Sequence, residues 1–423
     1  MSSTTMLIDP LPDGWRNVQL GDLCDRVSDS YKPVRGGDTP YIGLEHLSQG
    51  YPAFVGQGIE SDIKSQKTAF RANDVLFGKL RPYLRKGAKA GFNGVCSTDI
   101  LAFRAQESCD PNFLQFLIHS DPFIAHATAT TTGVQHPRTS WPSLREFKLS
   151  APPLSEQKSI AKVLASVQKA IEAQERIILT TTELKQALMQ KLFSEGLRGE
   201  PQKETEIGLV PESWEVVELG DIAKIERGKF AHRPRNEPRF YGGEYPFVQT
   251  GDVSNCDGRV RSYAQTLNKD GLAISKMFSA GTILITIAAN IGFTGILEFD
   301  SACPDSLIGI TPNKDVHTEF LNYYLMTQQQ EMDRLSPRGT QKNINIQFLK
   351  PWPIPMPSLE EQIQISDLFA AADHKIRVAS TQRSSLQGLF RSLLHELMSS
   401  NISVTAIRQT RHSKVIVNTM SLS

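Results

Sequence analysis

The chain has 423 residues, which is too long for one ordinary domain and enough for two domains with connecting elements. Hydrophobic residues make up 39% and charged residues 22%, so each domain can bury a core of ordinary size. The 46 Lys and Arg residues are balanced by 45 Asp and Glu, which argues against a free-standing nucleic-acid binder but leaves room for local basic patches and charged partners.

The cysteines and the apolar stretches indicate a cytoplasmic protein. The five cysteines are scattered without a CxxC pair and suit neither a disulfide framework nor a zinc site, so we expect reduced thiols. The first ten residues lack the basic and apolar regions of a secretory signal. Residues 282–297 are the most apolar stretch, but polar and glycine residues interrupt it, and it is too short to span a bilayer.

One sequence pattern occurs twice along the chain. Residues 11–23 (LPDGWRNVQLGDL) recur as residues 210–222 (VPESWEVVELGDI). Four further segments match in the same order: 36–42 with 242–248, 113–117 with 320–325, 133–135 with 339–341, and 152–157 with 357–362. Ordered matches of this kind indicate a tandem duplication.

Each copy begins as a mixed α/β module. Apolar or β-branched runs at 74–77 and 281–287 follow turn residues and predict buried strands, and one or two short helices accompany them. Proline-rich segments at 151–153 and 351–357 prevent helix and mark the exit of each module.

A long helix is predicted after each exit. Apolar residues recur there at spacings of three and four, namely Ile160, Leu164, Val167, Ile171, Ile178, Leu184, Leu188 and Leu192, then Ile363, Leu368, Ala372, Ile376, Leu386, Phe390, Leu393 and Leu397. About 35 residues would reach roughly 50 Å. Because the stripe is narrow, we expect the two helices to pair antiparallel with the modules at opposite ends; the alternative is that each helix only covers its own module.

The predicted fold class is therefore α+β, with two tandem mixed α/β modules separated by two long antiparallel helices as a coiled-coil spacer, in a pseudo-two-fold internal repeat. The predicted boundaries are residues 1–153 for the first module, 154–196 for its helix, 197–209 for a linker, 210–357 for the second module, 358–399 for its helix, and 400–423 for a poorly ordered tail.

Motifs for catalysis are missing from the sequence. It contains no Walker-type phosphate loop, dinucleotide fingerprint, HExxH or GxSxG motif. Residues 110–113 and 121–123 resemble the adenine-methyltransferase loop but lack its second proline. A metal nuclease needs carboxylates near a lysine. Pro304-Asp305 and Glu146-Phe-Lys148 could supply them, but they lie in different copies and do not recur at equivalent positions, which argues against a nuclease centre. We expect neither a catalytic residue nor a metal site.

Residues 78–89 form the most basic segment of the first module. It has five basic residues, one aromatic residue and no acid, and it follows a buried strand, so we expect an exposed loop on a rigid base. Arginine can bond guanine edges or phosphate, lysine suits phosphate, and tyrosine can stack. The alternative is a solvated surface loop, where mixed charge would be usual. The candidate DNA-binding residues are Lys79, Arg81, Tyr83, Arg85, Lys86 and Lys89.

The second module has a different basic segment at 224–239, diluted by Glu226 and Glu237. Its candidate DNA-binding residues are Arg227, Lys229, Arg233 and Arg235. The segment that matches the first basic loop, 286–292, is nearly uncharged and offers Asn290. Two modules that share a scaffold but differ in their loops should read different DNA sequences.

A late loop in each module, 132–139 and 338–345, combines glycine with polar and basic side chains. Gln and Asn can bond adenine at two points, and Arg can do so with guanine. The alternative is a polar turn before the exit strand. The candidates are Gln135, His136, Arg138, Thr139, Arg338, Gln341, Lys342 and Asn343.

Taken together, these motifs resemble the specificity subunit of type I restriction–modification enzymes over residues 10–400. The shared features are a P-x-x-W-x-x-x-x-L-G-D opening, a late G-x-Q, and a P-P-L-x-E-Q exit into a long helix; the second exit departs from the pattern at Ser358. The resemblance implies that each module is a target recognition domain for one half of a bipartite, asymmetric DNA site. It also implies that the helices set the spacing and dock two methylation subunits.

The resemblance further implies a non-catalytic role in defence against foreign DNA. S-adenosylmethionine, ATP and Mg are then expected on the methylation and restriction subunits, with no cofactor on this chain. The alternative is a self-contained restriction or methyltransferase enzyme with its own target recognition, which would need the missing motifs. A purely structural scaffold would leave the basic loops and the divergent modules unexplained.

Overall fold

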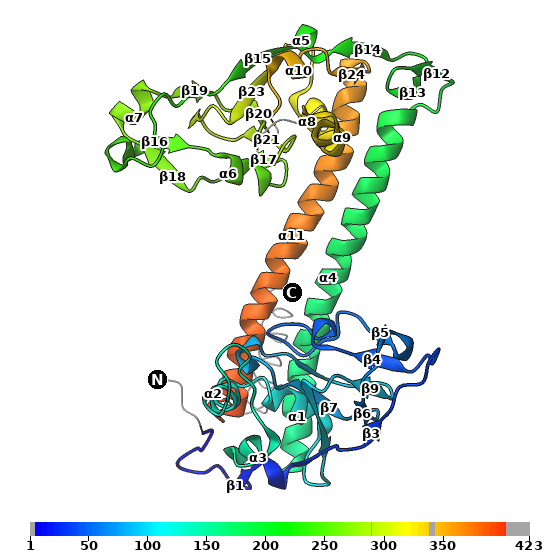
Figure 1. The fold of residues 1–423 in the computed structure, drawn as a ribbon, viewed down its shortest axis with the longest axis vertical. Coiled ribbons are helices and arrows are strands. Elements are labelled where there is room, and N and C mark those ends of the chain that lie inside the picture. The colour runs from blue at the N-terminus through cyan, green and yellow to red at the C-terminus, as the bar shows by residue number, and fades with distance from the viewer. Residues whose placement is uncertain (1–4, 289, 338–342, 403–423) are drawn as a thin grey trace, which may run out of the picture. The chain divides into compact units, whose positions relative to one another are not determined.

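The computed structural model describes residues 5–288, 290–337 and 343–402 (Figure 1). Within this part the chain forms two compact units. Unit 1 contains the chain up to Glu175 and from Thr381 onward, and unit 2 contains Arg176–Ser380. The division cuts through both long helices, so each unit holds one α/β module and one half of each helix.

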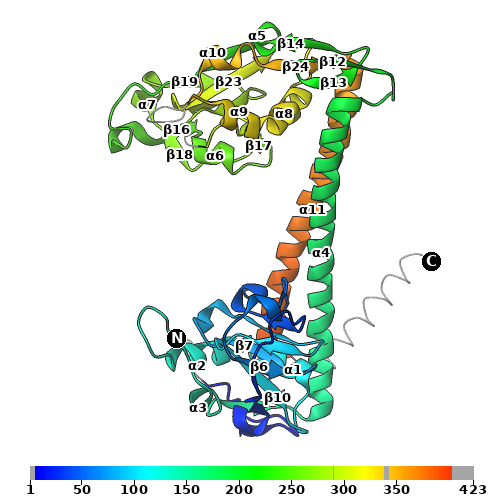
Figure 2. The same cartoon turned by 45° about the vertical axis from the view of Figure 1, so that its right-hand side comes forward.

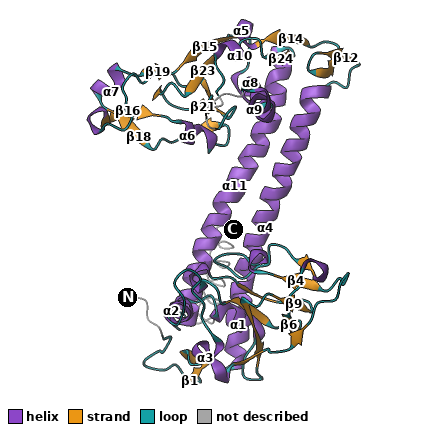
Figure 3. Cartoon of the chain, in the orientation of Figure 1, coloured by secondary structure: helices purple, strands orange, loops and turns teal. Residues whose placement is uncertain are grey.

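Module 1, in unit 1, contains two larger sheets and one strand pair (Figure 3). The pair is β1 (Arg16–Gln19) with β11 (Lys148–Ala151). The first sheet has the order β2 (Cys24–Arg26), β10 (Ile100–Ala105), β7 (Val75–Gly78), β8 (Gly87–Lys89). The second has the order β3 (Ser30–Tyr31), β6 (Lys67–Phe70), β9 (Gly94–Cys96), β4 (Pro40–Ile42), β5 (Gly58–Ile59). The short helices are α1 (Pro111–Leu117), α2 (Asp121–Ala129) and α3 (Trp141–Leu144), with 3-10 turns at Leu20–Asp22, Leu44–His46, Glu60–Asp62 and Pro82–Leu84.

Module 2, in unit 2, repeats this plan. β14 (Glu215–Glu218) pairs with β24 (Pro353–Met356). One sheet has the order β15 (Ala223–Arg227), β23 (Leu307–Pro312), β20 (Ile283–Thr286), β21 (Thr294–Leu297), β17 (Arg259–Val260), and the other β18 (Gln265–Leu267), β16 (Tyr241–Phe247), β22 (Ser301–Cys303), β19 (Lys276–Phe278). The helices are α5 (Leu219–Ile222), α6 (Thr250–Ser254), α7 (Lys269–Ala273), α8 (Thr318–Thr327), α9 (Gln329–Leu335) and α10 (Ile346–Leu349), with a 3-10 turn at Pro238–Phe240. Ahead of the module, β12 (Gln202–Thr205) and β13 (Gly208–Pro211) form a hairpin where the sequence predicted a linker.

The strand register shows that the modules are structural copies. The order β2-β10-β7-β8 in module 1 matches β15-β23-β20-β21 in module 2. Gly78 lies opposite Ile100 at the end of β7, and Thr286 lies opposite Leu307 at the end of β20. The predicted tandem α+β repeat is confirmed. The loops that leave β7 and β20 therefore start from equivalent points of one scaffold.

Two long helices follow the modules, α4 (Leu154–Glu195) and α11 (Leu359–Met398), with 42 and 40 residues (Figure 2). In unit 1 the first half of α4 shares an apolar core with the last half of α11, where Ile171 and Phe390 are buried together. In unit 2 the Phe193 and Phe369 rings lie 5.6 Å apart between centroids. The start of one helix accompanies the end of the other in each unit, so the pairing is antiparallel. The alternative that each helix only covers its own module is wrong.

The repeated sequence motifs fasten each module to its helix. The indole N–H of Trp15 donates to Glu156 Oε2 at 3.0 Å, and that of Trp214 donates to Glu361 Oε2 at 3.4 Å. Both indole rings are buried. The Trp of the opening motif and the Glu of the exit motif are thus bonded partners in both copies.

The neighbouring glutamine of the exit motif binds the start of a module helix. Gln157 Oε1 accepts the backbone N–H of Asp110 at 2.9 Å, just before α1. Gln362 Oε1 accepts the backbone N–H of His317 at 2.8 Å, just before α8. A buried N–H needs such an acceptor, so these glutamines have a structural role. The motifs that identify the repeat therefore stabilise the scaffold.

Candidate nucleic-acid interface

The two candidate loops of module 1 pair with each other. Leu80 and Arg138 form an antiparallel β-bridge. The backbone N–H of Arg81 donates to the Pro137 carbonyl at 2.8 Å, and that of Thr139 donates to the Lys79 carbonyl at 3.1 Å. The basic loop after β7 and the late loop before α3 therefore form one surface, although they are far apart in sequence.

Module 2 joins the equivalent loops in the same way. Ala288 and Asn343 form the matching β-bridge, and the Ile344 N–H donates to the Ile287 carbonyl at 3.0 Å. The Ile287 N–H donates to the Ser306 carbonyl at 3.2 Å, as the Lys79 N–H does to the Asp99 carbonyl at 2.9 Å. One backbone frame thus carries Lys79 and Arg138 in module 1, and Ile287 and Asn343 in module 2. The predicted residues Arg338, Gln341 and Lys342 lie outside the described residues.

The exposed groups of the module 1 surface come from both loops. Arg81 has a left-handed backbone conformation (φ 51°), and its Nη2 lies 3.5 Å from the Gln135 carbonyl. Tyr83 is 51% exposed, and Gln135 and His136 are also exposed. No hydrogen bond engages the Lys79 ammonium within the described residues. These side chains offer a guanidinium, an ammonium, an amide, an imidazole and a phenol to an approaching molecule.

Three other basic candidates are bonded within the module. Arg85 Nη1 donates to the His119 carbonyl at 3.1 Å, and its Nη2 pairs with Asp121 at 2.5 Å. Lys86 Nζ donates to the Leu44 carbonyl at 2.6 Å, and Lys89 Nζ donates to Asn73 Oδ1 at 3.1 Å. These bonds stabilise the conformation of the basic loop. Their acceptors lie in other segments of the chain, so the sequence of the loop alone could not predict them.

Thr139 is the candidate least available to a ligand. Its side chain is 3% exposed, and its hydroxyl lies 2.9 Å from that of Thr130. Thr139 therefore has almost no surface to offer a ligand. Its physical role is to hold the end of the late loop against α2.

Arg138 is partly exposed and has a fixed partner. Its Nε and Nη2 donate to Asp99 Oδ1 and Oδ2 at 2.7 and 3.2 Å. This two-point bond is the main reason why the pKa of the Asp99 carboxyl is lowered from its ordinary value. Lys79 and His136 add favourable charge around the same carboxylate. The sequence did not single out Asp99.

The candidate arginines of module 2 gather around Asp305. Arg233 Nη2 donates to its Oδ2 at 2.7 Å, and Arg235 pairs with its Oδ1. Arg227 Nε donates to the main-chain carbonyl of Asp305 at 2.7 Å. The other described candidates of this module, Lys229, Asn290 and Asn343, are exposed.

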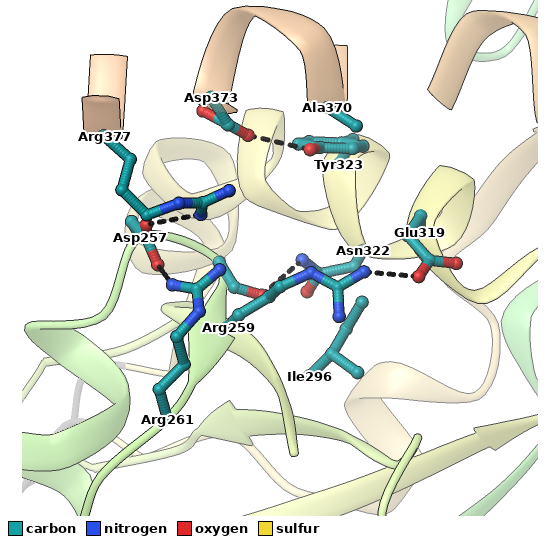
Figure 4. Close-up of a pocket in the computed structure, with 11 residues that line it drawn as sticks. Asp257, Arg259, Arg261, Ile296, Glu319, Asn322, Tyr323, Ala370, Asp373 and Arg377 are labelled. Carbon is teal, nitrogen blue, oxygen red and sulfur yellow. Dashed lines mark hydrogen bonds and ion pairs between the residues drawn. The ribbon is translucent and has the colours of Figure 1, made fainter. Parts of the chain in front are cut away.

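A separate charged cluster lies where module 2 meets α11 within unit 2 (Figure 4). Arg259 pairs with Glu319 at 2.5 Å, and Arg261 pairs with Asp257 at 2.5 Å. Arg377 on α11 lies 3.9 Å from the same Asp257. Each arginine faces a carboxylate, so the cluster ties the module to the helix and offers little net positive charge to DNA.

Across the part of the chain that the structure describes, no group of three or more His, Cys, Asp or Glu side chains could hold a metal ion. Within the same residues, each helix is too short or too polar to cross a membrane. The five cysteines are free thiols.

Comparison with protein families matches the chain twice to the type I restriction modification DNA specificity domain, over residues 12–181 and 211–387. The MjaVIII specificity subunit of a type I restriction enzyme from Methanocaldococcus jannaschii is 25% identical over 421 residues, covering 93% of this chain and 94% of the relative. The EcoBI specificity subunit of Escherichia coli is 27% identical over 318 residues, covering 66% and 64%.

Solved structures show the same fold. The S subunit of a type I restriction–modification system from M. genitalium aligns with a TM-score of 0.61 at 16% identity, covering 94% of this chain and 99% of that one. A chain from a structure of a type I restriction–modification system aligns with a TM-score of 0.55 at 23% identity, covering 92% and 98%.

Proposed function

Because this chain belongs to the family of type I restriction–modification DNA specificity subunits, we propose that each of its modules reads one half of a bipartite, asymmetric DNA site. The chain is a non-catalytic DNA-recognition subunit that works with partner subunits of a type I restriction–modification system. It supplies the sequence specificity, and the chemistry belongs to the partners.

The proposal depends mainly on one observation: the two modules hold their loops with the same backbone bridges but place different side chains on them. Equivalent bridges, Leu80 with Arg138 and Ala288 with Asn343, hold the loops in the two modules. The groups on that frame differ, since module 1 has the half-buried Lys79 where module 2 has the fully buried Ile287, and Arg138 where module 2 has Asn343. A constant frame with variable contacts is how one fold can read two different sequences.

We assign the contacts by exposure and bonding. In module 1 the candidates for direct DNA contact are Lys79, Arg81, Tyr83, Gln135, His136 and Arg138. In module 2 they are Arg227, Lys229, Arg235, Asn290 and Asn343. Arg85, Lys86, Lys89 and Arg233 support the loops through internal bonds. Arginine and the amides suit base edges, and lysine suits phosphate.

The long helices suit a spacer between half-sites. A helix of 42 residues extends about 63 Å at 1.5 Å per residue, which is on the order of two turns of duplex DNA at ~34 Å per turn. The proposal includes two methylation subunits docked on these helices, with S-adenosylmethionine bound to them, and restriction subunits with ATP and Mg in the full complex. It retains the division into modules at 1–153 and 210–357, and it places the chain in the cytoplasm with its DNA target.

Selection from a random duplex library tests the proposal. The chain is assembled with its methylation subunits, and bound duplexes are sequenced. The expected result is one motif made of two unlike halves with a fixed gap. The chain alone is expected to neither methylate nor cleave DNA. A selection without sequence preference would contradict the recognition role, and turnover by a homogeneous preparation of the chain alone would favour the self-contained enzyme.

A further inference from the structure

One turn in each module places an aspartate among the arginines of the candidate interface. The turn between β9 and β10 contains Asp99, and the turn between β22 and β23 contains Asp305. Cys96 and Cys303 end the strands before these turns, so the two aspartates differ by one position in the matched copies. The same part of the frame thus carries a carboxylate in both modules.

Asp99 holds Arg138 by one edge of its guanidinium. Nε and one N–H of Nη2 are bonded to the carboxylate, and Nη1 lies 3.4 Å from the His136 carbonyl. A guanidinium has five N–H groups in a planar fork. One N–H on Nη1 and one on Nη2 therefore remain beyond these bonds. The Arg138 side chain is 42% exposed, and its two bonds to Asp99 fix the plane of the guanidinium, so these two N–H groups are the ones left for a ligand.

Asp305 also binds arginines of the candidate interface, but these come from the loop that follows β15. Its carboxylate binds Arg233 and Arg235. Arg233 also donates to the Phe230 carbonyl at 2.6 Å and to the His232 carbonyl at 2.9 Å, so it is fixed within the loop. In the described part of the chain, the Arg235 guanidinium is bonded only to Asp305, and its side chain is 43% exposed. Arg235 therefore stands to Asp305 as Arg138 stands to Asp99, although it comes from a different loop and the frame position equivalent to Arg138 is Asn343.

A carboxylate on a DNA-facing surface opposes phosphate binding, so it must contribute something other than affinity. An arginine side chain that rotates freely can bind any phosphate, which carries no sequence information. An arginine held by a carboxylate keeps a fixed orientation, in which two parallel N–H donors can match the O6 and N7 atoms of guanine. Resting on the function proposed above, we propose that Asp99 and Asp305 are specificity-determining positioning residues. Each one orients a single arginine, Arg138 or Arg235, toward the base edges of its own half-site.

The test compares Asp99→Asn and Asp305→Asn in the full chain assembled with its methylation subunits. The affinity is measured for the selected motif, for the motif with each base pair changed, and for unrelated duplex over a range of salt. Asp99→Asn is expected to reduce discrimination at one or two base pairs of one half-site by about 5- to 100-fold, and Asp305→Asn to do so only in the other half. Binding to unrelated duplex should strengthen and depend more steeply on salt, because the carboxylate no longer offsets the arginine.

Arg138→Lys separates orientation from charge. Lysine keeps the positive charge but cannot make the two-point contact, so the same base pairs should lose discrimination with little change in the salt dependence. This variant also carries the test if Asp99→Asn fails to fold, which thermal unfolding reveals. Asp13→Asn and Asp315→Asn are matched controls, because these exposed aspartates have no ion pair within the described residues. They should leave every base preference unchanged.

The outcomes separate the two proposals. Unchanged discrimination in folded Asp99→Asn and Arg138→Lys variants would overturn the positioning role while leaving DNA recognition intact. Equal losses in both half-sites from either aspartate variant would also overturn it. A wild-type complex that selects no motif would instead contradict the proposed function itself.

Discussion

The ammonium of Lys185 on α4 lies 2.6 Å from Oδ1 of Asp373 on α11, and both side chains are largely buried in unit 2. The Tyr323 hydroxyl donates to the other carboxylate oxygen at 2.7 Å, so module 2 joins the same contact. Counting from the matched Glu156 and Glu361, the equivalent helix positions of unit 1 hold Phe390 and Gln168. The two copies of the repeat therefore use different chemistry to pair the same helices.

This difference predicts an asymmetric response to substitution. Lys185→Met leaves the Asp373 carboxylate buried with only the tyrosine as partner, and it should lower the free energy of unfolding of unit 2 by about 1 to 3 kcal/mol. Lys185→Met combined with Asp373→Leu should recover most of that loss, because an apolar pair needs no charge partner. Urea unfolding of the purified chain measures both. A double variant as unstable as the single one would contradict this account of the pair.

The basic loop of module 1 predicts two different kinds of loss. Arg81 is exposed, so Arg81→Ala should weaken DNA binding by the assembled complex and reduce the log–log salt slope by about one unit. Arg85 is bonded to His119 and Asp121, so Arg85→Ala should lower the melting temperature and weaken binding through the shape of the loop. Binding titrations at several salt concentrations, with thermal unfolding alongside, distinguish the two. Equal salt slopes for wild type and Arg81→Ala would make Arg81 a solvated surface residue.

A buried histidine predicts how stability depends on pH. Burial lowers the pKa of His119 to about 4, and its Nε2 lies 2.9 Å from the Gly87 carbonyl. The unfolded chain binds a proton at this residue below its ordinary pKa of about 6.5, whereas the folded chain does not until about pH 4. Stability should therefore fall as the pH drops through this window, by up to ~1.4 kcal/mol per pH unit.

Comparison with His119→Gln isolates this effect, because glutamine can donate to the same carbonyl without titrating. Urea midpoints of both proteins are measured between pH 7.5 and 5. The wild type should lose more stability than the variant over this range. Parallel losses would show that other groups cause the pH dependence.

The spacer role predicts that helix length sets the gap in the DNA site. Four residues inserted between Ile178 and Leu184 lengthen the helix by about 6 Å and nearly preserve the apolar stripe. At ~3.4 Å per base pair, this added length corresponds to a gap that is longer by one or two base pairs. Two inserted residues turn the stripe by about 200° and should damage assembly. Methylation of a duplex library with varied gaps measures both variants. Full activity at the original gap in the four-residue variant would mean that the partner subunits position the modules.

Much of the fold was predictable because it depends on local or repeated signals. The three-and-four spacing of apolar residues predicted α4 and α11, and the matched Trp15 and Trp214 motifs predicted the duplication. The hairpin β12–β13 was missed, since residues 197–209 read as a polar linker without strand alternation.

The surface formed by the loops could not be predicted in the same way. The bridge between Leu80 and Arg138 joins two loops that meet only after the sheet and α2 have folded. Whether a lysine is exposed or bonded to a distant carbonyl, as Lys86 is to Leu44, depends on that long-range packing. Asp99 and Asp305 did leave a signal, because each lies between a matched cysteine and the long apolar strand that follows. Read together, the two copies could have revealed it.

Methylome sequencing of the host tests directly whether this chain specifies the methylated site. The strain is compared with a deletion of the gene for this chain, and with strains that carry Asp99→Asn or Asp305→Asn. We expect one bipartite adenine-methylated motif that disappears when the gene is deleted. Asp99→Asn should relax the base preference in one half of this motif only, and Asp305→Asn in the other half only. A methylome that is unchanged when the gene is deleted, in cells that express its partner subunits, would contradict the claim that this chain specifies the methylated site.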